Sequence, residues 1–268
     1  FLMALMGVAE DRRVAGSHER KPVMIPSERI PRIIHHVWFG GKPKPAGMQK
    51  VIDGWSRMMP ECEVKEWNEG TIDLSRHPWM QRMHDEGRYA FASDYARFMV
   101  LLEHGGLYLD TDVVMKKSFL PFFRERSFWS FEFDSFLSTA IIGAEPGHPL
   151  IASLLREYDA LAGPRVNNSI VTEYFLAHYP DFHLNNRDQM LPEGVRVYPK
   201  EYFVVPGFDQ RKNFSTHEAN NHWKPEKSGS RAGPVVRRLI GDVLFFKLVN
   251  LRMNMTSDYP KMDKARGR

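Results

Sequence analysis

Two aspartates separated by one residue, Asp110 and Asp112, follow directly on the apolar run at residues 107–109. In an extended segment the side chains at i and i+2 point to the same side, so this spacing predicts two carboxylates presented together, with Thr111 facing away. Mg²⁺ and Mn²⁺ are commonly held by one or two carboxylates, with phosphate and water completing the shell. Open α/β sheets bind ligands at the carboxyl ends of their strands. The position therefore favours a cation site for a nucleotide diphosphate, with two solvated loop acids as the alternative.

A second acidic and basic pair lies upstream, where Asp94 and Arg97 are three residues apart in a helical pattern. This spacing places both side chains on one helix face. A surface ion pair at this spacing would contribute only a few tenths of a kcal/mol to the stability of the fold. The neighbouring Phe91, Tyr95 and Phe98 favour a partly buried pair instead, in which the guanidinium offers charge-assisted hydrogen bonds to phosphate oxygens.

The elements that position these residues alternate between strands and helices. Residues 33–39 read as a buried strand and residues 64–67 as another, while residues 48–59 and 89–103 carry apolar side chains at helical spacing. Gly105 and Gly106 end the second helix, and a short strand at 107–109 follows. Further helices are expected near 149–161 and over 235–253. The alternation predicts an α/β fold.

Composition narrows the class of protein. The chain has 268 residues, 43% hydrophobic and 26% charged, which is typical of a globular domain and excludes disorder and low complexity. No apolar stretch is long enough to cross a bilayer. The net charge of +4 is mild, and without an aromatic-interleaved basic stripe we expect no nucleic-acid partner. Cys62 is the single cysteine, which favours a reducing, cytoplasmic compartment, and the start at Phe1 suggests a missing upstream piece.

Longer motifs connect these residues to a known family. The run Ser93-Asp94-Tyr95-Ala96-Arg97, followed by residues 105–112 (GGLYLDTD), resembles the signature of glycosyltransferase family 32, the DXD-motif sugar-binding-region enzymes. This family includes initiating mannosyltransferases and capsular enzymes, and it is related to the catalytic domains of clostridial glucosylating toxins. The family's opening strand is similar to residues 30–41, and a later element rich in proline and aromatic residues is similar to residues 197–203. Its closing motif is similar to His217 with Trp223. The resemblance covers about residues 30–224.

The resemblance implies a GT-A fold, a Rossmann-like mixed central sheet flanked by helices, and a nucleotide-sugar donor. By similarity, Val37 and Trp38 would hold the base, which tips the preference toward a UDP-sugar over a GDP-sugar. Asp94 and Arg97 would contact the donor sugar and its phosphates, and Tyr108 is similar to a donor-site tyrosine. A core tryptophan ending a strand and a core tyrosine are the alternatives for Trp38 and Tyr108.

The same resemblance implies a site for Mn²⁺ or Mg²⁺. Asp110 would reach the ribose or a metal-bound water, Asp112 would bind the metal directly, and His217 would complete the metal shell unless it is structural. Trp223 would close over the diphosphate on a loop. Asp94, Arg97 and Asp112 would be the catalytic residues.

Two positions depart from the family pattern. His222 stands where the family often has serine, and residues 138–140 (STA) lack an asparagine that is often found there. These departures put in doubt the usual contacts of the closing loop and of the sugar or acceptor on that side.

The expected reaction moves a hexose from the donor to a hydroxyl of a glycan or a lipid-linked oligosaccharide, in capsular or other polysaccharide biosynthesis. Activation of the leaving diphosphate by the cation and Arg97 would be the main catalytic effect. The resemblance implies retention of anomeric configuration. Because no carboxylate nucleophile is evident, we expect attack by the acceptor on the face from which the diphosphate leaves.

Two other functions remain as alternatives. The strand followed by Asp110-Thr111-Asp112 also fits the start of a haloacid-dehalogenase-like phosphatase, with Asp110 as nucleophile. The basic and apolar segment 235–268 is typical of an amphipathic helix on an anionic membrane or on a partner, although packing on its own domain is the simpler interpretation. We therefore expect a lead-in at 1–29, a catalytic domain at 30–234 and a C-terminal helix and tail at 235–268. The protein would be cytoplasmic, with peripheral contact at the inner face of the cell membrane.

Overall fold

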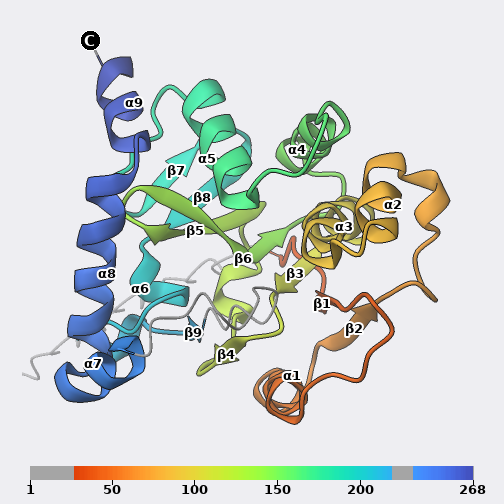
Figure 1. Cartoon of the computed structure of the whole chain (residues 1–268), viewed down its shortest axis with the longest axis horizontal. Coiled ribbons are helices and arrows are strands. Elements are labelled where there is room, and N and C mark those ends of the chain that lie inside the picture. Colours follow the sequence, from red (N-terminus) through yellow and green to blue (C-terminus); the bar gives the residue numbers. More distant parts are fainter. Residues whose placement is uncertain (1–26, 219–231, 268) are drawn as a thin grey trace, which may run out of the picture.

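The computed structural model describes residues 27–218 and 232–267. A mixed sheet of seven strands forms the centre of the molecule, in the order β2-β1-β3-β6-β5-β8-β7, and β4 and β9 pair as a separate ribbon (Figure 1). The strands are β1 (Ile33–Val37), β2 (Glu63–Trp67), β3 (Gly106–Leu109), β4 (Val113–Met115), β5 (Ser127–Phe133), β6 (Phe136–Ala144), β7 (Gln189–Leu191), β8 (Val195–Tyr198) and β9 (Ser215–His217). The helices are α1 (Ala46–Met58), α2 (Pro78–Asp85), α3 (Tyr89–His104), α4 (Pro149–Asp159), α5 (Asn167–His178), α6 (Lys200–Phe203), α7 (Ala232–Ile240), α8 (Asp242–Thr256) and α9 (Tyr259–Arg266).

Strand directions change within the sheet. β1 pairs in parallel with β2 and β3, β6 runs antiparallel to both β3 and β5, and β5 is parallel to β8. The predicted α/β fold with a mixed central sheet flanked by helices is confirmed.

The sheet separates two apolar cores. Successive side chains of β3 alternate between them: Tyr108 packs with α2, α3, α4 and α5, whereas Leu107 and Leu109 pack with α1 and the aromatic residues around Phe119. This alternation explains why the strand is buried on both faces, and it directs Tyr108 toward Arg97 of α3.

The turn between α3 and β3 depends on glycine. Gly105 has φ of 63°, and its N–H donates to the carbonyl of Leu101, which ends the helix. An added Cβ would lie 2.6 Å from Cδ of Pro146. The helix therefore stops where the sequence predicts, and the next residues enter the sheet with Asp110 at the carboxyl end of β3.

The ribbon of β4 and β9 connects the residues after β3 to a distant part of the chain. Val113 is directly opposite His217 in this antiparallel pair, and the N–H of Glu218 donates to the carbonyl of Asp112 at 3.2 Å. The indole N–H of Trp55 on α1 donates to the carbonyl of Val113 at 2.8 Å. His217 is thereby fixed beside the segment that carries the two aspartates.

The C-terminal segment forms three helices along one edge of the molecule (Figure 1). The sequence predicts one helix over 235–253, but the structure divides it at Gly241, where φ is 78°. The side-chain amide of Asn250 on α8 donates to Asp134, beyond the end of β5, at 2.9 Å. This contact joins α8 to the residues that follow β5. None of the helices in the described ranges has the length and hydrophobicity needed to cross a membrane.

Candidate active site

A cleft of about 930 Å³ opens above the carboxyl ends of β1 and β3. Its lining includes all the site residues predicted from the sequence that lie within the described part of the chain, Val37, Trp38, Asp94, Arg97, Tyr108, Asp110, Asp112 and His217. Residues from α5 and from the junction of α8 and α9 line it as well. Trp223 and His222 lie outside the described residues.

A buried guanidinium lies at the base of this cleft. Arg97 is only 5% exposed, and its Nη2 donates to Asp94 at 2.5 Å. Its Nη1 donates to the carbonyl of Thr139 at 2.5 Å and lies 3.4 Å from the carboxylate of Asp110. The expected partly buried pair of Asp94 and Arg97 is therefore confirmed, and Asp110 joins it from the end of β3.

The surroundings of this cluster set its charge. Burial, with a smaller contribution from the Asp110 carboxylate, raises the pKa of Asp94 to about 7, against the opposing effect of Arg97. Burial also disfavours the charged guanidinium, but Asp110, Tyr108 and Asp94 outweigh it and raise the pKa of Arg97 above its ordinary value. Arg97 thus stays positively charged between the two carboxylates, and it lines the cleft.

Tyr108 and Asn167 complete this half of the site. The hydroxyl of Tyr108 donates to Asp110 at 2.9 Å, and its ring lies 4.8 Å from the guanidinium carbon of Arg97. The side-chain amide of Asn167, the first residue of α5, donates to Asp94 at 3.2 Å. The hydroxyl of Tyr158 in turn donates to Asn167 at 2.6 Å. Each carboxylate is therefore oriented by a neutral donor as well as by Arg97.

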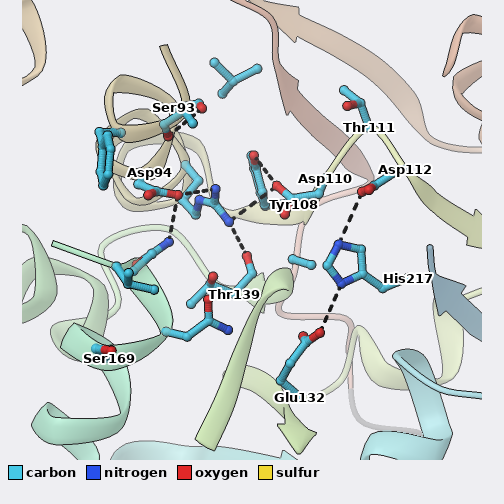
Figure 2. Close-up of a pocket in the computed structure, with 18 of the residues that line it drawn as sticks. Ser93, Asp94, Tyr108, Asp110, Thr111, Asp112, Glu132, Thr139, Ser169 and His217 are labelled. Atoms are coloured by element: carbon cyan, nitrogen blue, oxygen red, sulfur yellow. Dashed lines mark hydrogen bonds and ion pairs between the residues drawn. The ribbon is translucent and has the colours of Figure 1, made fainter. Parts of the chain in front are cut away.

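A second cluster faces the same cleft. Nε2 of His217 lies 3.3 Å from the carboxylate of Asp112, and Nδ1 lies 3.4 Å from that of Glu132 on β5. Figure 2 shows Asp112, His217 and Glu132 in a line beside the separate group of Asp94, Tyr108, Asp110 and Thr139. Burial disfavours a charged imidazole, but Glu132 and Asp112 outweigh that effect and raise the pKa of His217 well above its ordinary value.

The two aspartates of the motif separate into these two clusters. Residues 110–112 do not form an extended segment, because the N–H of Val113 donates to the carbonyl of Asp110 at 3.0 Å and closes a turn. The prediction that both carboxylates point to one side of a strand is therefore wrong. The turn arises because Val113 pairs with β9, which redirects the chain immediately after Asp112.

The donor set for a divalent cation can be judged from these contacts. Asp112 and His217 fit as ligands, since a carboxylate and an imidazole from two fixed elements face each other in the cleft. Asp110, the other predicted ligand, contacts Arg97 and Tyr108 instead. Within residues 27–218 and 232–267 no three acidic, histidine or cysteine side chains are close enough together to form a complete metal site. A cation here would take its remaining ligands from a diphosphate and water.

Two residues at the end of β1 also line the cleft. Val37 and Trp38 lie at the carboxyl end of β1, with Val37 buried and Trp38 partly exposed. The indole N–H of Trp38 donates to the carbonyl of Lys42 at 2.7 Å, which fixes the loop that follows the strand. The indole face is thereby held at the edge of the cleft.

Sequence reasoning missed Glu132 and Asn167. Glu132 lies in an aromatic-rich strand, and Asn167 begins a helix in a region with many turn-forming residues, so neither belongs to a recognisable motif.

Comparisons with known proteins agree with this geometry. Residues 45–129, which include the Asp110-Thr111-Asp112 motif, match the family model described as a glycosyltransferase sugar-binding region containing a DXD motif. An uncharacterized glycosyltransferase, L373, of Acanthamoeba polyphaga mimivirus is 28% identical over 59% of this chain and 67% of its own length. Inositol phosphoceramide mannosyltransferase 3 of Schizosaccharomyces pombe is 27% identical over 51% of this chain and 39% of its own length.

Solved structures similar to this chain are also glycosyltransferases. The PaToxG glycosyltransferase has a TM-score of 0.46 at 19% identity, covering 56% of this chain and 73% of that one. The galactosyltransferase LgtC, solved in complex with donor and acceptor sugar analogs, has a TM-score of 0.39 at 12% identity, covering 63% and 74%.

The matched region and the named relatives indicate a glycosyltransferase, and residues 45–129 are similar to the sugar-binding region of the DXD-motif enzymes. That region includes β3 and the motif at its carboxyl end, on the mixed sheet flanked by helices that the sequence predicts.

Proposed function

We propose that this glycosyltransferase transfers a hexose from a nucleotide diphosphate sugar to a hydroxyl of a glycan or glycolipid, with Mn²⁺ or Mg²⁺ and with retention of anomeric configuration. The observation that carries the proposal is the arrangement of the cleft. A buried guanidinium, the Asp112 and His217 pair, and a partly exposed indole line one space of about 930 Å³. These groups match the phosphates, cation and base of such a donor.

Different residues of the cleft would bind the base, the sugar, the phosphates and the cation. Trp38 and Val37 would stack on the base, with a UDP-sugar favoured. Asp94 would accept hydrogen bonds from sugar hydroxyls while Arg97 neutralises phosphate oxygens, and Asp110 would accept a bond from the ribose. Asp112 and His217 would hold the cation, which when bound stabilises negative charge on the diphosphate.

Bond breaking at the anomeric carbon sends its electron pair to the leaving phosphate oxygen. Arg97 stabilises this charge more in the transition state than in the ground state, because it is fixed in place and shielded from water. The acceptor oxygen then bonds to the anomeric carbon on the same face, and its proton passes to the departing phosphate. Proton NMR of the product tests the stereochemistry: an inverted anomeric bond would contradict this step.

The phosphatase alternative loses its support at Asp110. A phosphatase nucleophile needs a free carboxylate facing the phosphorus. Here Asp110 accepts a hydrogen bond from Tyr108 and lies beside Arg97. The sugar-binding region accounts for the same motif.

The surface of α8 supports an acceptor at a membrane. Leu244, Leu248, Leu251 and Met255 form one stripe along the helix, and each is between 50% and 77% exposed. Lys247 and Arg252 are exposed beside them, and no acidic residue follows Asp242 within the helix. The opposite side of α8 packs on the protein through Phe246 and Asn250. This combination of apolar and basic side chains suits an anionic bilayer surface.

This surface would bring the cleft to a lipid-linked acceptor at the inner face of the cell membrane, as a step in polysaccharide biosynthesis. One relative is named as an inositol phosphoceramide mannosyltransferase, which also points to a lipid acceptor. The junction of α8 and α9 lines the cleft through Met253, Thr256 and Ser257. A helix lying on the bilayer would therefore place the cleft close to it.

Vesicle flotation tests the membrane contact. We expect the protein to float with vesicles that contain phosphatidylglycerol, and the double variant Leu248→Gln, Leu251→Gln to reduce the bound fraction at least about tenfold. Met190→Gln, which changes an exposed apolar residue on β7, is the matched control. Equal flotation of both variants and the unaltered protein would remove α8 as the contact surface.

A further inference from the structure

The imidazole of His217 lies between two carboxylates that come from different elements. Asp112 approaches Nε2 from the turn after β3, and Glu132 approaches Nδ1 from β5. All three side chains are at least four-fifths buried, with exposed fractions of 15% for His217, 17% for Asp112 and 12% for Glu132. Each ring nitrogen therefore faces a carboxylate, and the 3.4 Å contact at Nδ1 leaves that atom without a hydrogen bond among the described residues.

The two carboxylates come from different kinds of backbone. Glu132 lies near the end of β5, where the register with β6 is irregular between Phe131 and Phe133, and beyond the residues of β5 that pair with β8. Asp112 lies in a turn that connects two elements. The imidazole is therefore contacted by a strand residue on its Nδ1 side and by a turn residue on its Nε2 side.

The carboxylate of Glu132 is only partly satisfied within the protein. Its Oε2 is buried and has no hydrogen-bond partner within the described residues. A buried, unsatisfied carboxylate oxygen is destabilising. Such a group is expected where a site needs it for function.

From these contacts we infer that Glu132 is a positioning residue, which holds Nδ1 of His217 and so keeps Nε2 directed at Asp112 for binding a divalent cation. Histidines that bind metals commonly donate their other ring N–H to a carboxylate, which fixes the ring orientation and the tautomer and makes the ligand more basic. The inference rests on the proposed cation site at Asp112 and His217. It assigns Glu132 no contact with the reacting atoms.

Binding of Mn²⁺ alone to the full chain, followed by electron paramagnetic resonance of the free ion, tests this inference. We expect Glu132→Ala to weaken Mn²⁺ binding by about 10- to 100-fold. Glu132→Gln should restore part of that loss, because the amide oxygen can still accept a hydrogen bond from Nδ1. Asp134→Asn, two residues further along and paired with Lys200 and Asn250 instead, is the matched control and should bind like the unaltered protein.

The possible outcomes separate the inference from the proposed function. Absence of Mn²⁺ binding by the unaltered protein would overturn the cation site and the inference with it. Binding by the unaltered protein and equal binding by Glu132→Ala would overturn the inference alone. If turnover is abolished equally in Glu132→Gln and Glu132→Ala while Mn²⁺ affinity is unchanged, Glu132 acts directly on the substrate, and the positioning role is wrong. Circular dichroism of each variant establishes that it is folded.

Discussion

Replacement of Arg97 by lysine keeps the positive charge at the base of the cleft but removes the planar guanidinium. In the native protein Nη2 reaches Asp94 while Nη1 reaches the carbonyl of Thr139 and approaches Asp110. The single ammonium of lysine, on a flexible chain, cannot occupy the positions of both Nη1 and Nη2. We therefore expect Arg97→Lys to leave either Asp94 or Thr139 without its partner.

The size of the effect follows from burial. A hydrogen bond to a charged group contributes about 1.5–3 kcal/mol, and a stranded buried partner adds its own desolvation cost. Arg97 is 5% exposed, so solvent compensates little, and we expect unfolding to become easier by about 2–4 kcal/mol. If Arg97 also stabilises the leaving phosphate, transfer should fall by about 10²–10³-fold, as for loss of one preorganised charge-stabilising group.

Urea unfolding followed by tryptophan fluorescence measures the stability difference. The control is Arg165→Lys, because Arg165 forms a comparable pair with Glu173, in which Arg165 is 46% exposed and Glu173 36%. That change should cost less than about 1 kcal/mol, since solvent screens the pair. Equal losses of stability in the two variants would refute the argument that the buried fork holds the site together.

Two further predictions concern the scaffold. Burial lowers the pKa of both His35 and His36 to about 4, against about 6.5 in an unfolded chain. Between pH 4 and pH 6.5 the unfolded state therefore binds more protons than the folded state. The unfolding free energy, measured by urea titration, should fall by up to about 3 kcal/mol per histidine as the pH falls from 6.5 to 4. An unfolding free energy that does not change over this pH range would contradict the prediction. At Gly143 an added Cβ would lie 2.0 Å from the buried ring of Phe128, so Gly143→Ala should lower the unfolding free energy by about 1–3 kcal/mol in the same assay. The control is Gly47→Ala, which has open space around it and should not lower the unfolding free energy. Equal stability of the two variants would show that the strand adjusts to the added methyl group.

The parts of the fold that the sequence predicts well are those that local pattern determines. The helix at α3 follows from apolar residues at helical spacing and from Gly105 at its end, and the i,i+3 spacing of Asp94 and Arg97 brings that pair together. The resemblance to a known family identified the residues of the cleft. The signals for the helix and for the ion pair lie within a few residues of one another in the chain.

The parts that the sequence does not predict depend on contacts between distant segments. The turn at residues 110–112 forms because β4 pairs with β9, and the spacing of two aspartates carries no information about that pairing. Glu132 and Asn167 enter the site from β5 and α5 through tertiary packing. The break at Gly241 shows the same limit, since α8 carries apolar residues on both its packed and its exposed sides, and periodicity alone does not locate its ends.

The central claim is that a divalent cation bound by Asp112 supports transfer from a nucleotide sugar. The most direct test measures donor binding and hydrolysis by the purified protein across a panel of nucleotide sugars, with Mn²⁺, Mg²⁺ or a chelator, beside Asp112→Asn. We predict turnover of one donor that requires the cation, favours a uridine nucleotide and is lost in the variant. Failure to bind any donor under any of these conditions, or turnover unaffected by the chelator and by Asp112→Asn, would contradict the account.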